Sequence, residues 1–215
     1  IARWTAEAKG AVVSTPCFGN GKVYFGAWDN TLYAVNDSDG SPAWSRQLGR
    51  QIYYSPYHSP VFHLGKVFAT IPYDSIPSSS YLYALDSATG ETVWTYTSGS
   101  SLLTPILPAR MASTDIRGNH LVVLDGAGRA VQVRVSDGQF VWQSPGAGSL
   151  FGFVPIGDGI WVLGGSRGTL SITTEKGAYE YKVRDSFLFQ EPLVTRKAIL
   201  QGDTRGMLWA IKVLD

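Results

Sequence analysis

The residues able to do chemistry are few in this 215-residue chain, and their spacing forms no catalytic or metal-binding motif. The three histidines are His58, His63 and His120, and none of them has the His-x-x-x-His spacing of a metal site. The single cysteine, Cys17, follows a proline at the start of an expected strand, so we interpret it as a small buried apolar residue. We therefore expect no catalytic residue, no metal ligand and no cofactor.

Arginines at expected turns are candidates for a binding role. Arg167 and Arg205 each stand three residues before a leucine that opens an expected strand, where an earlier segment has Asp29. Arg129 lies one step away from that place in its own segment. Because the planar guanidinium group matches carboxylate and phosphate groups, these arginines predict a patch for an anion or an acidic partner. The alternative interpretation is solvated turn charges, some of them paired with an aspartate such as Asp203.

Aromatic side chains gather in segments that we expect to be loops or strand starts. They either pack inward against a central channel or form an exposed platform, which is typical of contacts with a protein or ligand. Aromatic clefts also suit sugars, so a glycan is a further alternative. Together with the arginines and Asp29, the candidate residues are Trp28, Tyr53, Tyr54, Tyr57, His58, Tyr73, Phe151, Phe153 and Phe189.

A repeated sequence positions these candidates. Its signature is an aspartate, then a glycine, then a tryptophan four residues after that glycine. Clear copies end at Gly40–Trp44, Gly90–Trp94 and Gly138–Trp142, and a degenerate copy has Tyr181 four residues after Gly177. The glycines are 50, 48 and 39 residues apart. That period matches the blade of about 40–50 residues in propeller repeats.

Each repeat contains four expected strands. Strand A opens with a proline, strand B is a Gly-x-Val-Tyr run, strand C is a Leu-Tyr-Ala run, and strand D carries the tryptophan. In this order, the turns between strands B and C and the links between strands D and A share one face of a propeller. We call these segments the B–C turns and the D–A links. Most of the candidate residues lie in them, and we expect each strand-D tryptophan to pack between neighbouring blades.

We predict an all-β propeller of four-stranded antiparallel blades, in a single domain over residues 1–215 that is alone or part of a longer chain. Five proline openings predict five blades. The last expected strand, Leu208–Asp215, is a strand C, and the first residues, Ile1–Trp4, match a strand D. We therefore predict that N- and C-terminal strands close one blade, which hides sheet edges and gives a monomeric ring.

Composition excludes some classes of partner. The net charge is +1 and no basic stripe is present, which argues against a nucleic-acid partner. No apolar run is long enough to predict a membrane span. Composition alone leaves the compartment open.

The repeat resembles the pyrroloquinoline-quinone-like (PQQ-like) β-propeller family. The residues that carry the resemblance are Gly21–Gly26, Leu82–Asp86 and Thr89–Trp94. This family includes quinoprotein alcohol dehydrogenases, a lipoprotein scaffold of bacterial outer-membrane-protein assembly, and sensor or binding domains. Most members work outside the cytoplasm, so the resemblance implies an extracytoplasmic, periplasmic or secreted protein. The dehydrogenases are longer, have eight blades and carry adjacent cysteines, which this chain lacks.

The expected function is therefore that of a noncatalytic extracytoplasmic scaffold or binding module. It would recognise a protein or a small ligand on the face of the B–C turns and D–A links. The alternatives are a ligand-sensing domain of a larger receptor or enzyme, a carbohydrate-binding propeller and, less favoured, a quinone-dependent dehydrogenase.

Overall fold

The structure is a computed structural model, and it describes residues 3–48, 59–71, 80–98, 115–117, 120–124, 129–143, 150–157, 160–165, 169–174, 177–182, 193–195 and 198–212. The chain divides into two compact units, which are described separately below. Unit 1 holds Ile1–Ala112 and Arg134–Gln139, and unit 2 holds Ser113–Val133 and Phe140–Asp215. That the chain forms a single domain stays a prediction.

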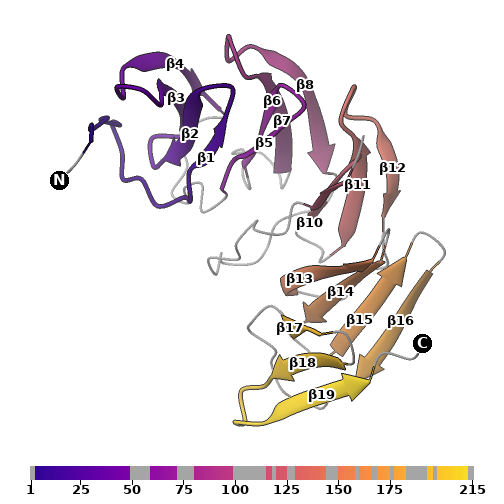
Figure 1. The fold of residues 1–215 in the computed structure, drawn as a ribbon. Coiled ribbons are helices and arrows are strands. Elements are labelled where there is room, and N and C mark those ends of the chain that lie inside the picture. The colour runs from indigo at the N-terminus through magenta and orange to yellow at the C-terminus, as the bar shows by residue number, and fades with distance from the viewer. Residues whose placement is uncertain are drawn as a thin grey trace. The chain divides into compact units, whose positions relative to one another are not determined.

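The described residues form antiparallel sheets and contain no helix (Figure 1). Four sheets have four strands, one has three, and in each sheet the strands follow chain order. Each sheet is therefore a run of hairpins, and we number them as blades 1 to 5. Blade 1 is β1 (Cys17–Gly19), β2 (Lys22–Ala27), β3 (Thr31–Asn36) and β4 (Pro42–Gln47). Blade 2 is β5 (Val61–His63), β6 (Lys66–Ile71), β7 (Ser80–Asp86) and β8 (Thr92–Ser98).

Blades 3 to 5 complete the set. Blade 3 is β9 (Asp115–Arg117), β10 (His120–Leu124), β11 (Ala130–Arg134) and β12 (Phe140–Gln143), and blade 4 is β13 (Leu150–Gly157), β14 (Ile160–Gly165), β15 (Thr169–Thr174) and β16 (Gly177–Lys182). Blade 5 is β17 (Leu193–Val194), β18 (Ala198–Gly202) and β19 (Leu208–Lys212). The all-β class and the four-stranded antiparallel blades are as predicted. Five blades in a closed ring stay a prediction.

The glycine and tryptophan signature sets the register between strands C and D. In blade 1, Ala34 pairs with Trp44 and a β-bulge follows directly, and in blade 2 Ala84 pairs with Trp94 in the same way. The glycine before strand D has a left-handed backbone, which a residue without a Cβ adopts at little cost. These φ angles are 73° at Gly40, 72° at Gly90 and 69° at Gly138.

The strand-D tryptophans pack on the glycine turn of the next blade, as predicted. The indole N–H of Trp44 donates to the Ser87 carbonyl at 3.1 Å, and a Cβ on Gly90 would come within 2.6 Å of the Trp44 ring. The indole N–H of Trp94 likewise donates to the Val135 carbonyl at 3.0 Å, and its ring lies against Gly138. Each tryptophan thus joins two blades through its ring and one hydrogen bond.

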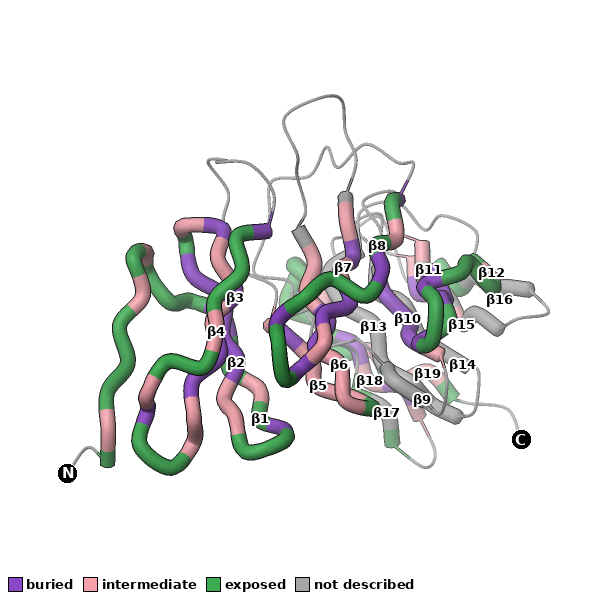
Figure 2. Tube along the Cα trace, turned by 90° about the horizontal axis from the view of Figure 1, so that it is seen from above, coloured by how far each residue is buried: buried purple, intermediate pink, exposed green. Residues whose placement is uncertain are grey.

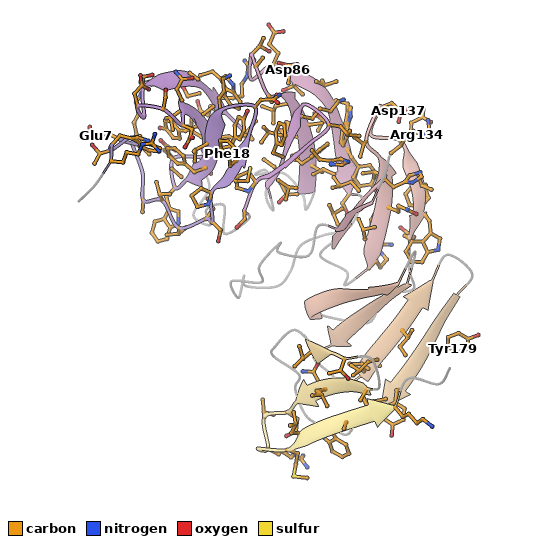
Figure 3. The ribbon with its side chains drawn as sticks, viewed as in Figure 1. Glu7, Phe18, Asp86, Arg134, Asp137 and Tyr179 are labelled. Carbon is orange, nitrogen blue, oxygen red and sulfur yellow. The ribbon has the colours of Figure 1, made fainter. Side chains whose placement is uncertain are left out.

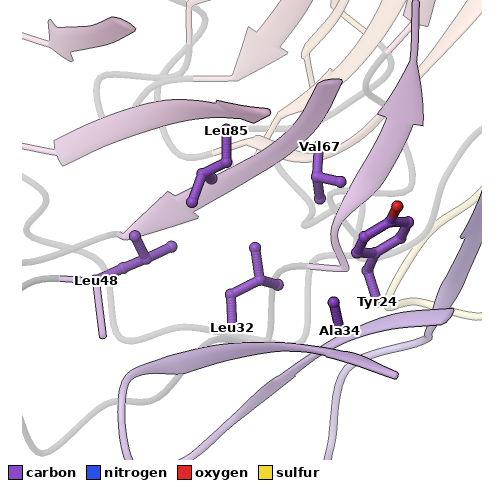
Figure 4. Close-up of a cluster of buried hydrophobic side chains, with 6 residues drawn as sticks. All are labelled: Tyr24, Leu32, Ala34, Leu48, Val67 and Leu85. Atoms are coloured by element: carbon purple, nitrogen blue, oxygen red, sulfur yellow. The ribbon is translucent and has the colours of Figure 1, made fainter. Parts of the chain in front are cut away.

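The core of unit 1 lies between blades 1 and 2. Tyr24, Leu32 and Ala34 from blade 1 pack with Val67 and Leu85 from blade 2, and Leu48 completes the cluster (Figure 4). Buried residues alternate with less buried ones along β3, as the tube in Figure 2 shows. This alternation is the pattern of a strand with one face in a core.

Blade 4 differs from the first three blades in the hairpin before strand D. Thr174 pairs with Gly177 across a two-residue turn, and the pairing continues without a bulge. The residue paired with Ile172, at the place of Trp44, is therefore Tyr179, whereas the spacing from the glycine predicts Tyr181. The prediction of Tyr181 is wrong because Gly177 itself pairs with Thr174 and no bulge follows, whereas Gly40 lies before β4 and a bulge follows it. Tyr179 is 75% exposed and projects from β16 (Figure 3).

The N-terminal residues lie along blade 1 in unit 1. Residues 3–16 contain no strand. Trp4 nevertheless packs like the other tryptophans, because its indole N–H donates to the Asp37 carbonyl at 2.8 Å and its ring lies against Gly40. Within the described residues, no helix is long and apolar enough to cross a membrane.

Candidate binding surface

The B–C turn of blade 1 is held by the carboxylate of Asp29. Asn30 closes the turn with a left-handed φ of 59° and donates its N–H to the Ala27 carbonyl at 3.1 Å. Asp29 accepts hydrogen bonds from the Thr31 N–H at 3.0 Å and from the Tyr33 hydroxyl at 2.5 Å. Burial raises the pKa of Tyr33, and the hydrogen bond to Asp29 raises it further. The carboxylate of Asp29 is therefore part of the frame of the turn.

The N-terminal segment covers one side of this turn. The Trp28 N–H donates to the Ala11 carbonyl at 3.0 Å, and the Lys9 N–H donates to the Tyr33 hydroxyl at 3.2 Å. A Cβ on Gly10 would lie 2.6 Å from the Asp29 nitrogen, so only glycine allows this approach. The segment thereby brings exposed apolar side chains beside an exposed aromatic one. We call Val12, Val13 and Trp28, which is 48% exposed, the turn patch.

The B–C turn of blade 5 has the same backbone with its charges rearranged. The Asp203 N–H donates to the Met207 carbonyl at 2.9 Å, so these residues are opposite each other across the turn, as Ala27 and Thr31 are in blade 1. Gly206 has a left-handed φ of 78° and corresponds to Asn30. Arg205 therefore stands where Asp29 stands in blade 1, as the sequence predicts.

The frame of this second turn comes from Asp203 instead. Its carboxylate accepts hydrogen bonds from the backbone N–H groups of Arg205 at 2.9 Å and Met207 at 3.0 Å, and from the Trp209 indole at 2.9 Å. These bonds match those that Asp29 makes to Thr31 and Tyr33 in blade 1. The turn therefore keeps its hydrogen bonds with an exposed arginine at the Asp29 place.

The other candidate residues fall into two groups. Arg129 is half-buried and directly precedes β11, and Phe151 and Phe153 lie in β13, where Phe153 pairs with Leu163. The candidates outside the described residues are Tyr53, Tyr54, Tyr57, His58, Tyr73, Arg167 and Phe189.

Neither a metal site nor a reactive cysteine is found in the described part of the chain. No group of three or more His, Cys, Asp or Glu residues is arranged there to hold a metal ion. Cys17 is partly buried against the unit 1 core, and burial raises the pKa of its thiol to about 12. The thiol is therefore neutral at physiological pH.

Sequence reasoning missed two parts of this surface. Val12 and Val13 precede the first expected strand and match no repeat element, so only the hydrogen bond from the Trp28 N–H to the carbonyl of the neighbouring Ala11 reveals them. The sequence analysis names Asp203 only as a charge partner of a turn arginine. Its role in the turn frame could have been found, because it is the acidic residue two positions before Arg205 in a turn that has lost the usual aspartate.

The sheets, the tryptophan packing and the turns together define a β-propeller of PQQ-like repeats. The family described as outer membrane protein assembly factor BamB matches residues 2–215. The chain therefore belongs to that family. The recognised resemblance to PQQ-like propellers is confirmed.

Solved structures agree at the level of the fold. BamB from Moraxella catarrhalis is similar with a TM-score of 0.70 and 15% identity, over 98% of this chain and 61% of that one. The computationally designed protein Ika8 gives a TM-score of 0.68 and 14% identity, over 92% of this chain and 57% of that one. A quinohemoprotein alcohol dehydrogenase from Comamonas testosteroni gives a TM-score of 0.63 and 14% identity, over 97% of this chain and 42% of that one.

The chain thus spans about three fifths of the length of that BamB structure, at identities that establish the fold alone. A comparison with curated protein sequences gives no match.

Proposed function

We propose that this protein is a noncatalytic, extracytoplasmic scaffold that binds a partner protein through its B–C turns. The observation that carries the proposal is the exchange between blades 1 and 5. Asp29 supports its own turn, whereas in blade 5 Asp203 provides that support and an exposed arginine occupies the Asp29 place. A fixed turn frame with a changed exposed side chain is the usual arrangement of a recognition loop.

The chemistry of the exposed residues favours a protein as the partner. The turn patch offers a tryptophan beside two valines, and Trp and Arg are the side chains enriched where protein interfaces gain most of their affinity. Arg205, with Arg129 and Arg167 in the turns of blades 3 and 4, suits an acidic surface on that partner. These contacts are proposed for each blade separately.

The family supports the same role. Its description as an outer membrane protein assembly factor is that of a protein that works with other proteins. We take the extracytoplasmic location from the family as well, since its members work outside the cytoplasm.

The test compares two exposed cations of blade 5. The Arg205→Ala variant changes the B–C turn, and Lys212→Ala changes an exposed cation at the other end of β19. Each tagged variant is incubated with envelope extract, and bound proteins are quantified by mass spectrometry. We expect a partner that is retained by wild type and by Lys212→Ala and is lost from Arg205→Ala. Equal retention by both variants would refute a binding role for this turn.

A further inference from the structure

The N-terminal segment lies along blade 1 without forming a strand, and we call residues 3–13 the strap (Figure 2). Near one end of the strap, the indole N–H of Trp4 donates to the Asp37 carbonyl at 2.8 Å. Near the other end, the carbonyl of Ala11 accepts the Trp28 N–H at 3.0 Å. The strap therefore reaches the B–C turn of blade 1, and its last two residues belong to the turn patch.

The hydroxyl of Tyr33 lies between the strap and this turn. It donates to the Asp29 carboxylate at 2.5 Å and accepts the Lys9 N–H at 3.2 Å. The same carboxylate accepts the Thr31 N–H at 3.0 Å, so it also fixes the backbone of the turn. One side chain thus connects the backbone of the strap to the carboxylate that frames the turn.

Packing fixes the ring that carries this hydroxyl. The rings of Phe25 and Tyr33 stack with centroids 5.4 Å apart and an interplanar angle of 11°. The two residues are direct partners in the neighbouring strands β2 and β3. Because an aromatic pair across two strands stabilises both rings, the hydroxyl has a defined position for the strap and the turn.

The strap approaches the turn closely at the residue after Lys9. A Cβ on Gly10 would lie 2.6 Å from the Asp29 nitrogen and 3.0 Å from the Trp28 nitrogen. Only a backbone without a side chain fits at that distance. The strap therefore lies against the backbone of Trp28, whose side chain is half-exposed in the turn patch.

Blade 5 shows that the turn frame itself does not need a hydroxyl. Trp209 follows Leu208 as Tyr33 follows Leu32, and its indole N–H donates to the Asp203 carboxylate at 2.9 Å. An indole N–H donates but does not accept a hydrogen bond, whereas a tyrosine hydroxyl does both. In blade 1 the strap uses this additional acceptor. The tyrosine is therefore explained by the strap and not by the turn alone.

We propose that Tyr33 is the positioning residue of the turn patch. It holds the strap against the B–C turn of blade 1, and the held strap presents Trp28 to the partner protein. This inference rests on the proposed function, because it concerns the same class of turn. Tyr33 acts through Asp29 and Lys9. Loss of its hydroxyl therefore releases the strap and leaves the strand pairing of blade 1 in place.

Amide hydrogen exchange measured by NMR tests whether Tyr33 holds the strap. Tyr33→Phe removes the hydroxyl and keeps the ring that stacks on Phe25. Tyr24→Phe is the matched control, because its hydroxyl lies within hydrogen-bond distance of the Gly19 and Ser87 carbonyls, which are outside the strap. We expect the strap amides to exchange about three to ten times faster in Tyr33→Phe, as one lost hydrogen bond allows. They should keep the wild-type rate in Tyr24→Phe.

Two amides report different steps of the release. The Lys9 N–H loses its acceptor directly in Tyr33→Phe. The Trp28 N–H exchanges faster only if the strap moves away, because its acceptor is the Ala11 carbonyl. Wild-type exchange at Trp28 in Tyr33→Phe would overturn the inference. Equal acceleration in Tyr33→Phe and Tyr24→Phe would also overturn it, since that result reports a general loss of stability.

Partner binding separates this inference from the proposed function. The variants are incubated with envelope extract as described for Arg205→Ala, and we expect Tyr33→Phe to retain at least about threefold less partner than wild type or Tyr24→Phe. If Arg205→Ala loses the partner and Tyr33→Phe retains it, the proposed function stands and the inference fails. If Tyr33→Phe loses the partner and Arg205→Ala retains it, the inference is supported and the binding role of the blade 5 turn fails.

Discussion

At the scale of single residues, glycines show how tightly the blades are joined. Gly90 and Gly65 have the same left-handed φ of 72°, but a Cβ would meet the Trp44 ring at 2.6 Å on Gly90 and nothing within 4 Å on Gly65. Substitution by alanine therefore adds the same backbone strain at both positions and a steric clash at one.

The paired substitutions make this difference measurable. We expect Gly65→Ala to lower the free energy of unfolding by about 1–2 kcal/mol, the cost of a left-handed backbone. Gly90→Ala adds an overpacking cost of about 1–3 kcal/mol. Urea unfolding of both variants tests the prediction. Equal losses would mean that the Trp44 ring moves aside freely and does not hold the blades together.

A second residue-scale prediction concerns pH and Cys17. Burial raises the pKa of the thiol from 9.0 to about 12, so the folded state favours the neutral form. The resulting stabilisation is fully present below pH 9.0 and is lost as pH rises toward about 12. We expect the free energy of unfolding to fall between pH 9 and 11, and to fall less in Cys17→Ala. Tyr24 and Tyr33, whose pKa values burial also raises, contribute to the fall that remains. Identical pH profiles of wild type and Cys17→Ala would show that the thiol is not buried.

At the scale of elements, one strand position occurs in two environments. Leu32 and Leu208 both open a strand C, but they are 3% and 71% exposed. We expect Leu32→Ala to cost about 2–5 kcal/mol and Leu208→Ala less than about 0.5 kcal/mol. Thermal unfolding of the two variants compares these losses. A large cost at Leu208 would mean that this leucine is buried in the folded protein.

The turn of blade 5 separates stability from binding. The carboxylate of Asp203 accepts three hydrogen bonds that define the turn, so we expect Asp203→Ala to lower stability by about 1–3 kcal/mol. Arg205 contributes its backbone N–H to these bonds, and alanine keeps that group. Arg205→Ala should therefore keep these three bonds and lose less stability than Asp203→Ala by urea titration. The assignment of the turn frame to Asp203 fails if Arg205→Ala is the less stable variant.

At the scale of the whole molecule, the sequence predicts the architecture well because the repeat combines two strong local signals. A left-handed glycine and a tryptophan four residues later specify both the strand C–D hairpin and the contact with the next blade. Gly40–Trp44 and Gly90–Trp94 both form this hairpin, and Trp44 and Trp94 pack on the turns at Gly90 and Gly138 of the next blades.

The same signal fails where the hairpin changes. In blade 4 the glycine is already paired within the hairpin and no bulge follows, which moves the tryptophan place to Tyr179. Spacing from Gly177 cannot reveal this change. The candidate surface is less predictable for a similar reason. The position of Arg205 follows from the repeat, but the support from Asp203 and the approach of the N-terminal segment to the Trp28 backbone depend on contacts that the repeat does not encode.

A binding role for the B–C turns is tested most directly by affinity for the purified partner. An arginine that contacts a carboxylate contributes about 1.5–3 kcal/mol, so we expect Arg205→Ala to weaken binding by about tenfold or more. Lys212→Ala, the matched exposed cation of the same strand, should keep the wild-type affinity. Equal affinities of wild type and Arg205→Ala would contradict the proposed function.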